Sequence, residues 1–283
     1  MSAPAYSLVT LANGVRSVRS HAEAETFHPV IGPVAEAEAL YGRQLRLRER
    51  RAAHPGEFVI WDVGLGAGAN ALTVLRATHD LPGRVRLVSF DHTLEPLRFA
   101  LQHGEELGYF GGYEELVATL LAEGQAEQDD GQQRVAWEVV VADFPAWLQA
   151  RPTGIPAPHA ILFDAYSPAK NPAMWTLPLF TSLFRQLDPA RPCAMPTYSR
   201  ATLLRVTWLL AGFYVGVGHA TGEKDETTLA ANALALLDEP LDRKWLERAR
   251  RSTSAEPLHE AQYRQAPLTE LTWERLRTHP QFQ

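Results

Sequence analysis

The amino-acid sequence predicts an α/β fold built on a mostly parallel sheet with helices on both faces. Short apolar runs typical of buried strands alternate along the chain with longer segments of helical periodicity. Such alternation indicates parallel strands joined by right-handed helical crossovers. The 283 residues, 46% hydrophobic and 21% charged, also have the balance of an ordinary globular protein. That length suffices for one large α/β domain with accessory elements or for two small domains.

Composition excludes several classes of protein. The single cysteine, Cys193, leaves no internal disulfide and no multi-cysteine zinc site, and we expect no metal. No run approaches the roughly 18 apolar residues of a membrane helix, and the N-terminus lacks a secretory signal. We therefore expect a cytoplasmic protein without a membrane partner. The net charge of −6 argues against indiscriminate nucleic-acid binding.

The N-terminal region predicts a hairpin followed by a helix. Residues 8–11 and 15–20 flank Asn13-Gly14, a dipeptide suited to a type I′ turn. Good helix formers then continue from Val34 to Arg51. We assign residues 1–50 to this extension, 51–238 to the main domain, and 239–283 to a tail of unknown role.

The main domain predicts strands and helices in alternation. Strands are expected at 58–64, 84–91, 137–143, 158–166 and 192–199. Helices are expected at 69–81, 94–107, 114–124, 171–187 and 201–212. The polar stretch 125–133 predicts an exposed loop, and residues 214–220 and 227–234 predict a closing antiparallel pair.

Candidate functional residues gather at the predicted carboxyl ends of four strands, where parallel sheets bind their ligands. They are Gly64–Gly68, Asp91, Asp143 and Asp164. The segment Asp62–Asn70 (DVGLGAGAN) places three glycines between a strand and a helix, whose amides can face a carboxylate or phosphate. Its spacing also satisfies a dinucleotide pattern, and Asp91 can hold ribose hydroxyls in either an NAD or an S-adenosylmethionine (AdoMet) enzyme.

Two further features favour AdoMet. Asp62 precedes the glycines, where a carboxylate can meet the ammonium of the methionine moiety. Asp143 can accept from the adenine amine beside the ring of Phe144, although an N-cap is the alternative for Asp143. We therefore expect a Rossmann-like class I AdoMet-dependent methyltransferase whose cofactor-binding residues are Asp62, Gly64, Gly66, Gly68, Asn70, Asp91, Asp143 and Phe144.

The segment Asp164–Trp175 (DAYSPAKNPAMW) suits methylation of an amine. Asp164 can orient a neutral amine or accept its proton, and is the candidate catalytic residue. Prolines stiffen the loop that would close over substrate. Trp175 offers either a face for base stacking or core packing. Lys170 is either a phosphate contact or an exposed lysine.

This segment resembles the D-G-F-A-P-A-K-N-P-x-M-W signature of the methyltransferase domain of the bacterial tRNA 5-methylaminomethyl-2-thiouridine biosynthesis protein. Gly64–Asn70 is similar to that family's G-F-G-x-G-x-N. Glu25–His28 with Gly32 and Glu36 is similar to its E-x-Y-H-S…G…E pattern. Thr197–Ser199 and the following helix resemble its T-Y/F-T/S and A-G-F elements. The resemblance covers about residues 8–232.

The resemblance implies methyl transfer from AdoMet to the exocyclic amine of 5-aminomethyl(-2-thio)uridine at the tRNA wobble position. It implies substrate binding by Glu36, Tyr166, Lys170, Asn171, Met174, Trp175 and Tyr198. Bifunctional relatives carry a fused flavin-dependent oxidase domain, so a stand-alone form working with a separate oxidase or an upstream tRNA-modifying enzyme is expected. The basic segments Arg43–Arg51 and Arg243–Arg251 are then candidate tRNA contacts, with solvated helix faces as the alternative.

The sequence departs from the family at several positions. Ala165 and Tyr166 replace glycine and phenylalanine, and Pro29 replaces a serine after His28. The basic G-x-K-R-E element appears as the more acidic Gly222–Glu226. These changes affect substrate identity more than the cofactor site. A methyltransferase of small molecules or proteins, and a non-catalytic AdoMet- or nucleotide-binding module, therefore stay open as alternatives.

Overall fold

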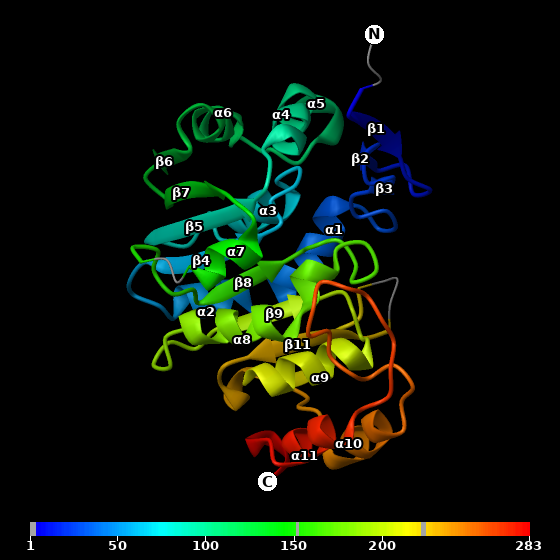
Figure 1. Ribbon diagram of the computed structural model, residues 1–283. Coiled ribbons are helices and arrows are strands. Elements are labelled where there is room, and N and C mark those ends of the chain that lie inside the picture. Colours follow the sequence, from blue (N-terminus) through cyan, green and yellow to red (C-terminus); the bar gives the residue numbers. More distant parts are fainter. Residues whose placement is uncertain (1–3, 151–152, 222–224) are drawn as a thin grey trace. The chain divides into compact units, whose positions relative to one another are not determined.

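The computed structural model describes residues 4–150, 153–221 and 225–283 (Figure 1). The chain forms two compact units. The first comprises residues 1–142 with 220–225, and the second comprises 143–219 with 226–283.

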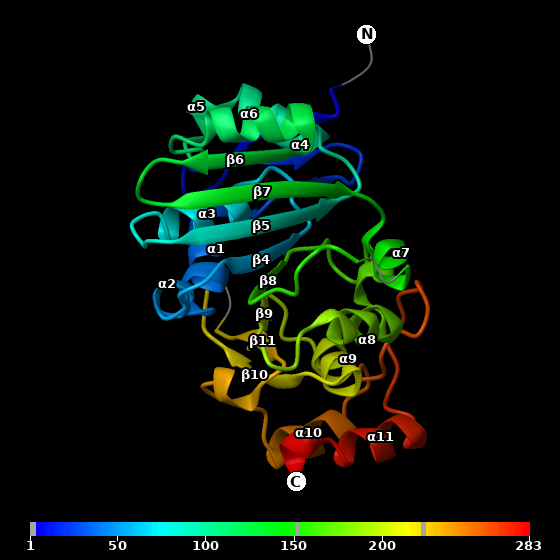
Figure 2. The ribbon, with the colours of Figure 1, turned by 90° about the vertical axis from the view of Figure 1, so that its left-hand side faces the viewer.

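The larger sheet of the first unit orders its strands β4, β5, β7 and β6, as Figure 2 shows. The strands β4 (Phe58–Val63), β5 (Arg84–Asp91) and β7 (Arg134–Val141) are parallel. All residues of β4 are buried, as expected for an interior parallel strand. The expectation of strands at 58–64 and 84–91 is confirmed.

The edge strand β6 (Gln125–Asp129) corrects the expectation of a loop at 125–133. It pairs antiparallel with β7, and its buried Ala126 lies opposite Trp137. An edge strand needs only one paired side, so exposed polar residues such as Gln125 and Glu127 are tolerated there. The polar composition of this segment made its alternation of exposed and buried residues, with Ala126 as the buried one, difficult to recognise from the sequence.

Four helices accompany this sheet: α3 (Ala69–Ala77), α4 (Glu95–Gln102), α5 (Gly104–Leu107) and α6 (Glu114–Glu123). The helix expected at 94–107 is divided into α4 and α5 at His103. Gly124 ends α6 with a φ of 76°, a left-handed conformation that suits glycine at this position.

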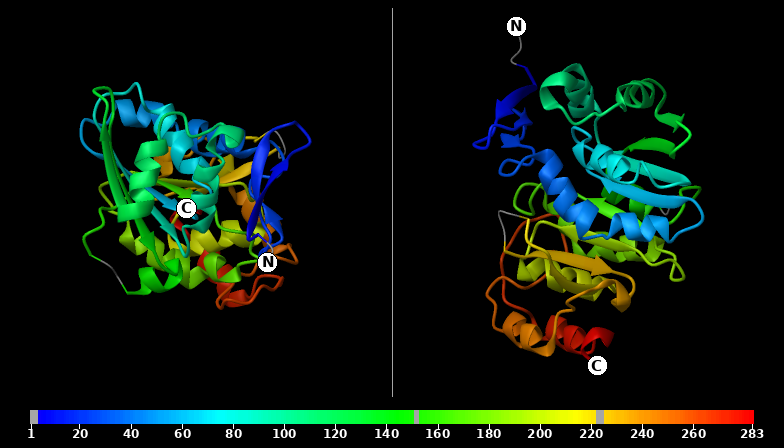
Figure 3. Two further views of the ribbon diagram at one scale, coloured as in Figure 1. Left: turned by 90° about the horizontal axis from the view of Figure 1, so that it is seen from above. Right: turned by 180° about the vertical axis from the view of Figure 1, so that it is seen from behind.

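The N-terminal hairpin is confirmed, and a short third strand extends it. The strands β1 (Tyr6–Thr10), β2 (Arg16–Ser20) and β3 (Glu25–Thr26) pair antiparallel. They lie beside α4 and α5 (Figures 1 and 3). The type I′ turn is wrong, because Gly14 has a positive φ and Asn13 does not. Asn13 Oδ1 instead accepts a hydrogen bond from the Val15 N–H.

The single helix expected from Val34 to Arg51 is also wrong. The chain forms α1 (Pro33–Ala37), a π-helical segment η1 (Glu38–Arg43) and α2 (Leu47–Ala52). Arg46 separates the last two with a φ of 48°. Leu45 and Leu47 are both buried, and residues two apart do not share a face of one helix. The break allows both leucines to be buried.

The second unit orders its strands β8, β9, β11 and β10. The strands β8 (Ala160–Phe163) and β9 (Ala194–Thr197) are parallel, whereas β11 (Thr227–Ala231) and β10 (Tyr214–Gly218) form the predicted antiparallel pair. Its α-helices are α7 (Phe144–Gln149), α8 (Leu177–Gln186), α9 (Thr202–Ala211), α10 (Arg243–Arg250) and α11 (Glu270–Arg277). Its 3-10 turns are η2 (Pro172–Trp175), η3 (Leu234–Leu236) and η4 (Pro280–Phe282).

The helix expected at 171–187 begins later, because Thr176 caps α8 by accepting from the Leu179 N–H. The tail folds onto this unit. The side-chain amide of Gln281 accepts a hydrogen bond from the Val215 N–H at 2.8 Å and donates one to the Val215 carbonyl at 2.7 Å. Throughout the described ranges, every helix is too short or too polar to cross a bilayer.

Candidate functional site

Asp62 lies fully buried in β4 at the end of a hydrogen-bond chain. The Ser89 hydroxyl donates to Asp62 Oδ2 at 2.8 Å, and the Trp137 indole N–H donates to Ser89 Oγ at 2.9 Å. Three neighbouring strands thus fix the direction of one carboxylate. Sequence reasoning missed Ser89, although a serine inside the apolar run of β5 was the available signal.

The glycine turn after β4 has the backbone that its sequence predicts. Gly64, Gly66 and Gly68 have φ angles of 94°, 50° and 80°, which L side chains rarely adopt. A Cβ on Gly68 would also lie 2.7 Å from Leu97 Cδ1. Both the backbone angle and the close approach of α4 therefore favour glycine at position 68.

Asp91 at the end of β5 closes this turn. Its Oδ2 accepts from the Gly66 N–H at 2.9 Å, and its Oδ1 accepts from the Thr93 N–H at 3.3 Å. A carboxylate has about four acceptor positions, so ribose hydroxyls can still bind. Asn70 is buried in the first turn of α3. The first unit therefore brings together the turn, the helix N-terminus and the acid that the sequence predicted to bind AdoMet, and their role in binding stays a prediction.

The N-terminal residues His28 and Glu36 contact each other. His28 Nδ1 lies 3.6 Å from Glu36 Oε2, and both side chains are largely buried. Glu36 was predicted to bind substrate, and that role stays a prediction. The structure adds an N-terminal aromatic residue that the sequence did not single out for the site, because a Cβ placed on Gly66 would lie 3.6 Å from Cε2 of Phe27.

The remaining predicted residues lie in the second unit. Asp143 is the N-cap of α7, where its Oδ1 accepts from the Ala146 N–H at 2.8 Å. The alternative considered for Asp143 therefore holds, and the adenine contact stays a prediction. Phe144 is buried and stacks on Trp147 with 5.9 Å between ring centroids.

The loop from Asp164 to Trp175 is held by its own hydrogen bonds. The Ser167 carbonyl accepts from the N–H groups of Lys170 and Asn171, both at 2.9 Å. The Trp175 indole N–H donates to the Tyr166 carbonyl at 2.6 Å. These bonds fix the loop as a compact turn in which Lys170 is exposed.

Trp175 corrects the expectation of a base-stacking platform. Its side chain is completely buried and packs edge-on against Phe163 at 5.3 Å and near Phe180. Core packing, the alternative considered for Trp175, describes this residue. Met174 beside it is also buried, whereas Asp164 and Asn171 are half-buried and accessible to a ligand.

Tyr198 follows β9, and hydrogen bonds to the neighbouring Ser199 hold this segment in place. Arg205, itself 1% exposed, donates to Thr228 Oγ1 at 3.0 Å, and the Thr228 hydroxyl donates to the Ser199 carbonyl at 2.6 Å. Arg205 also pairs with Glu226 at 3.2 Å. Of the acidic segment 222–226, residues 222–224 lie outside the described residues.

The basic segment Arg43–Arg51 divides into exposed and enclosed arginines. Arg51 is 2% exposed and donates to the carbonyls of His54 and Pro82, so it is unsuited to phosphate contact. Arg48 forms a bidentate ion pair with Asp80. In the second segment, Arg243, Lys244, Arg248, Arg250 and Arg251 are exposed.

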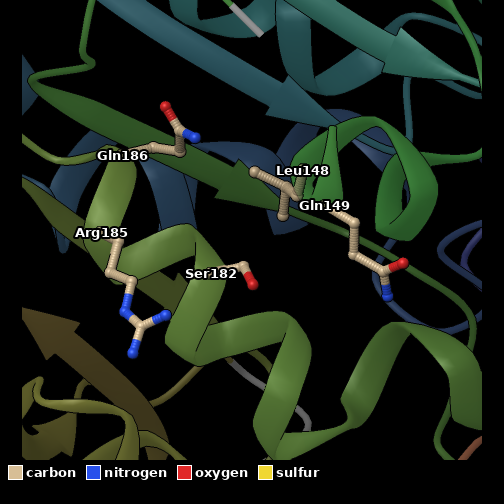
Figure 4. Close-up of a pocket in the computed structure, with 5 residues that line it drawn as sticks. All are labelled: Leu148, Gln149, Ser182, Arg185 and Gln186. Carbon is tan, nitrogen blue, oxygen red and sulfur yellow. The ribbon is translucent and has the colours of Figure 1, made fainter. Parts of the chain in front are cut away.

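A surface hollow in the second unit involves other residues (Figure 4). Its lining comes from the C-terminal halves of α7 and α8, whereas Asp143 and the 164–175 loop precede these helices. The lining residues are Leu148, Gln149, Ser182, Arg185 and Gln186, none of which the sequence predicted.

Comparison with known proteins supports the assignment of the cofactor. Residues 113–233 match a family described as S-adenosyl-L-methionine-dependent methyltransferase. The tRNA 5-methylaminomethyl-2-thiouridine biosynthesis bifunctional protein MnmC of Ectopseudomonas mendocina is 33% identical over 187 residues, covering 60% of this chain. Its counterpart from Aeromonas hydrophila is 31% identical over 210 residues, covering 68%. The chain spans 27% and 30% of the length of these two relatives.

A solved structure has a similar fold. The crystal structure of MNMC2 from Aquifex aeolicus matches with a TM-score of 0.70 and 22% identity, over 98% of this chain and 85% of that one. The predicted Rossmann-like methyltransferase fold with an N-terminal hairpin is thereby confirmed. The chain is an AdoMet-dependent methyltransferase similar to the methyltransferase domain of the MnmC proteins.

Proposed function

We propose that the protein methylates the exocyclic amine of 5-aminomethyl(-2-thio)uridine at the wobble position of tRNA. The observation that carries the proposal is the loop Asp164–Trp175, which combines the family-like sequence with a fixed conformation beside β8. The MnmC relatives are named for synthesis of the corresponding methylated nucleoside. Within the loop, Asp164 is a half-buried carboxylate at a strand end.

Bound AdoMet supplies an electrophilic methyl group, and the protein must present a neutral amine to it. The Gly64–Gly68 turn and Asp91 hold the cofactor in the first unit. Asp164 would orient the amine and accept the proton that nitrogen loses when its bond to the methyl carbon forms, while the bond from that carbon to sulfur breaks and S-adenosylhomocysteine leaves. Lys170 is exposed on the same loop, where its ammonium can contact a tRNA phosphate. The other proposed contacts are Asp143 for the cofactor and Asn171 and Tyr198 for the substrate.

Methyl transfer from labelled AdoMet to tRNA carrying 5-aminomethyluridine tests the proposal, with nucleoside analysis as the readout. We expect label in 5-methylaminomethyluridine. The same tRNA without the aminomethyl group is the matched control and should take no label. AdoMet binding without label in tRNA would contradict the proposed acceptor and direct the search to small amines and proteins.

Raising the salt concentration adds a second readout. An acceptor recognised through its phosphates binds more weakly as salt rises, whereas a small neutral acceptor does not. We expect the KM for tRNA to rise steeply with salt while the Kd for AdoMet changes little.

A further inference from the structure

An aromatic side chain from the N-terminal region lies on the glycine turn of the first unit. A Cβ placed on Gly66 would be 3.6 Å from Phe27 Cε2 and 3.9 Å from its Cδ2. The space between Gly66 and the Phe27 ring would therefore take one added methyl group, and the ring faces the side of Gly66 on which an L residue would carry its Cβ. The ring is half-buried and keeps accessible surface beside the turn.

Hydrogen bonds on both sides fix the backbone of Phe27. Its N–H donates to the Val18 carbonyl at 2.9 Å, and its carbonyl accepts from the Ser17 hydroxyl. Ser17 and Val18 belong to β2 and are both 1% exposed. Phe27 is therefore attached to a well-packed strand although it lies in a loop.

The next residue, His28, adopts a left-handed conformation with a φ of 48°. Such a conformation is uncommon outside glycine and persists where surrounding contacts impose it. The contact between His28 Nδ1 and Glu36 Oε2, at 3.6 Å, ties this turn to the start of α1. The backbone is therefore strained at His28, the residue that directly follows Phe27.

A second N-terminal aromatic residue, Tyr6, packs on the helix α4. The ring centroid of Tyr6 in β1 is 6.0 Å from that of Phe99 in α4. Burial raises the pKa of Tyr6, and the negative charge of Asp91 raises it further. Tyr6 therefore anchors β1 on α4 through Phe99, and α4 follows the strand that ends at Asp91.

We infer that Phe27 is a cofactor-positioning residue whose ring forms one wall of the AdoMet site at Gly66. The strained His28 and its contact with Glu36 hold the ring in place. An apolar wall gives the bound ligand a surface to pack on and limits its freedom beside the turn. The N-terminal sheet is accordingly part of the cofactor site.

Binding of AdoMet and of S-adenosylhomocysteine, measured by calorimetry without tRNA, tests this inference. Phe27→Ala should raise the Kd for both ligands roughly tenfold, the equivalent of losing one buried aromatic contact. Phe27→Tyr should bind like the wild type, and Phe27→Leu should be intermediate. The matched control is Val15→Ala, because Val15 packs on Gly32, a glycine outside the turn.

Thermal unfolding without ligand separates a positioning role from a structural one. Val15→Ala should change the melting temperature but leave the Kd unchanged. An unchanged Kd in folded Phe27→Ala overturns the inference; if that variant does not fold, an unchanged Kd in Phe27→Leu overturns it. The inference rests on AdoMet binding and not on the acceptor, so failure to methylate tRNA would leave it intact.

Discussion

The backbone N–H of Gly66 donates a 2.9 Å hydrogen bond to Oδ2 of Asp91. This bond joins the glycine turn after β4 to the carboxylate that ends the adjacent parallel strand. The two sequence features that predicted a cofactor site, the glycines and the downstream acid, therefore form one structural unit. Asp91 shapes the turn and also offers lone pairs to a ligand.

Asp91→Asn should weaken AdoMet binding, because the amide loses the negative charge that strengthens its hydrogen bonds. Loss of one or two charge-assisted hydrogen bonds predicts a Kd that is roughly 10- to 100-fold higher. Calorimetric titration with AdoMet checks this. Asp129→Asn, at the end of the edge strand β6, is the control and should bind normally. Equal Kd values for Asp91→Asn and wild type would exclude Asp91 from ligand binding.

Gly68→Ala should lower the free energy of unfolding by about 2 kcal/mol, from an unfavourable φ and a clash with Leu97. Gly131→Ala separates the two causes. Gly131 has a φ of 83°, close to the 80° of Gly68, but a Cβ there meets open space. Urea denaturation should show the larger loss for Gly68→Ala. Equal losses would mean that the approach of α4 contributes nothing.

The parallel core was predictable because its strands are continuous apolar runs that end in glycine or aspartate. The polar strand β6 and the interrupted helix of residues 33–52 were not, because tertiary packing overrode local composition. Within the site, Asp62 and Asp91 stood out as charges at strand ends. The hydrogen bond of Ser89 to Asp62 and the proposed role of Phe27 both depend on neighbours distant in sequence, and those neighbours are identified only in the folded structure.

The ion pair between Arg48 and Asp80 predicts how the pKa of Asp80 depends on Arg48. The Arg48 hydrogen bond lowers the pKa of the Asp80 carboxyl from 3.8 to about 2. A carboxyl whose pKa is lower in the folded state stabilises the fold above its ordinary pKa, and that stabilisation is lost as the pH falls towards 2. In Arg48→Ala, an NMR titration should find the pKa of Asp80 back near 3.8. Because the pair is exposed, the overall stability should change little.

Asp164→Asn should separate catalysis from cofactor binding. The amide keeps the size of the side chain but cannot accept the proton of the reacting amine, so we expect kcat to fall roughly 100-fold or more. The Kd for AdoMet should stay the same, because the proposed ligands of the cofactor in the first unit are unchanged. Single-turnover methylation of 5-aminomethyluridine tRNA, beside calorimetry with AdoMet, measures both quantities. The fall in rate should also be partly reversed at higher pH, where more of the free amine is neutral before it binds. A variant with normal turnover would make Asp164 a structural residue of the loop and would assign proton removal to solvent.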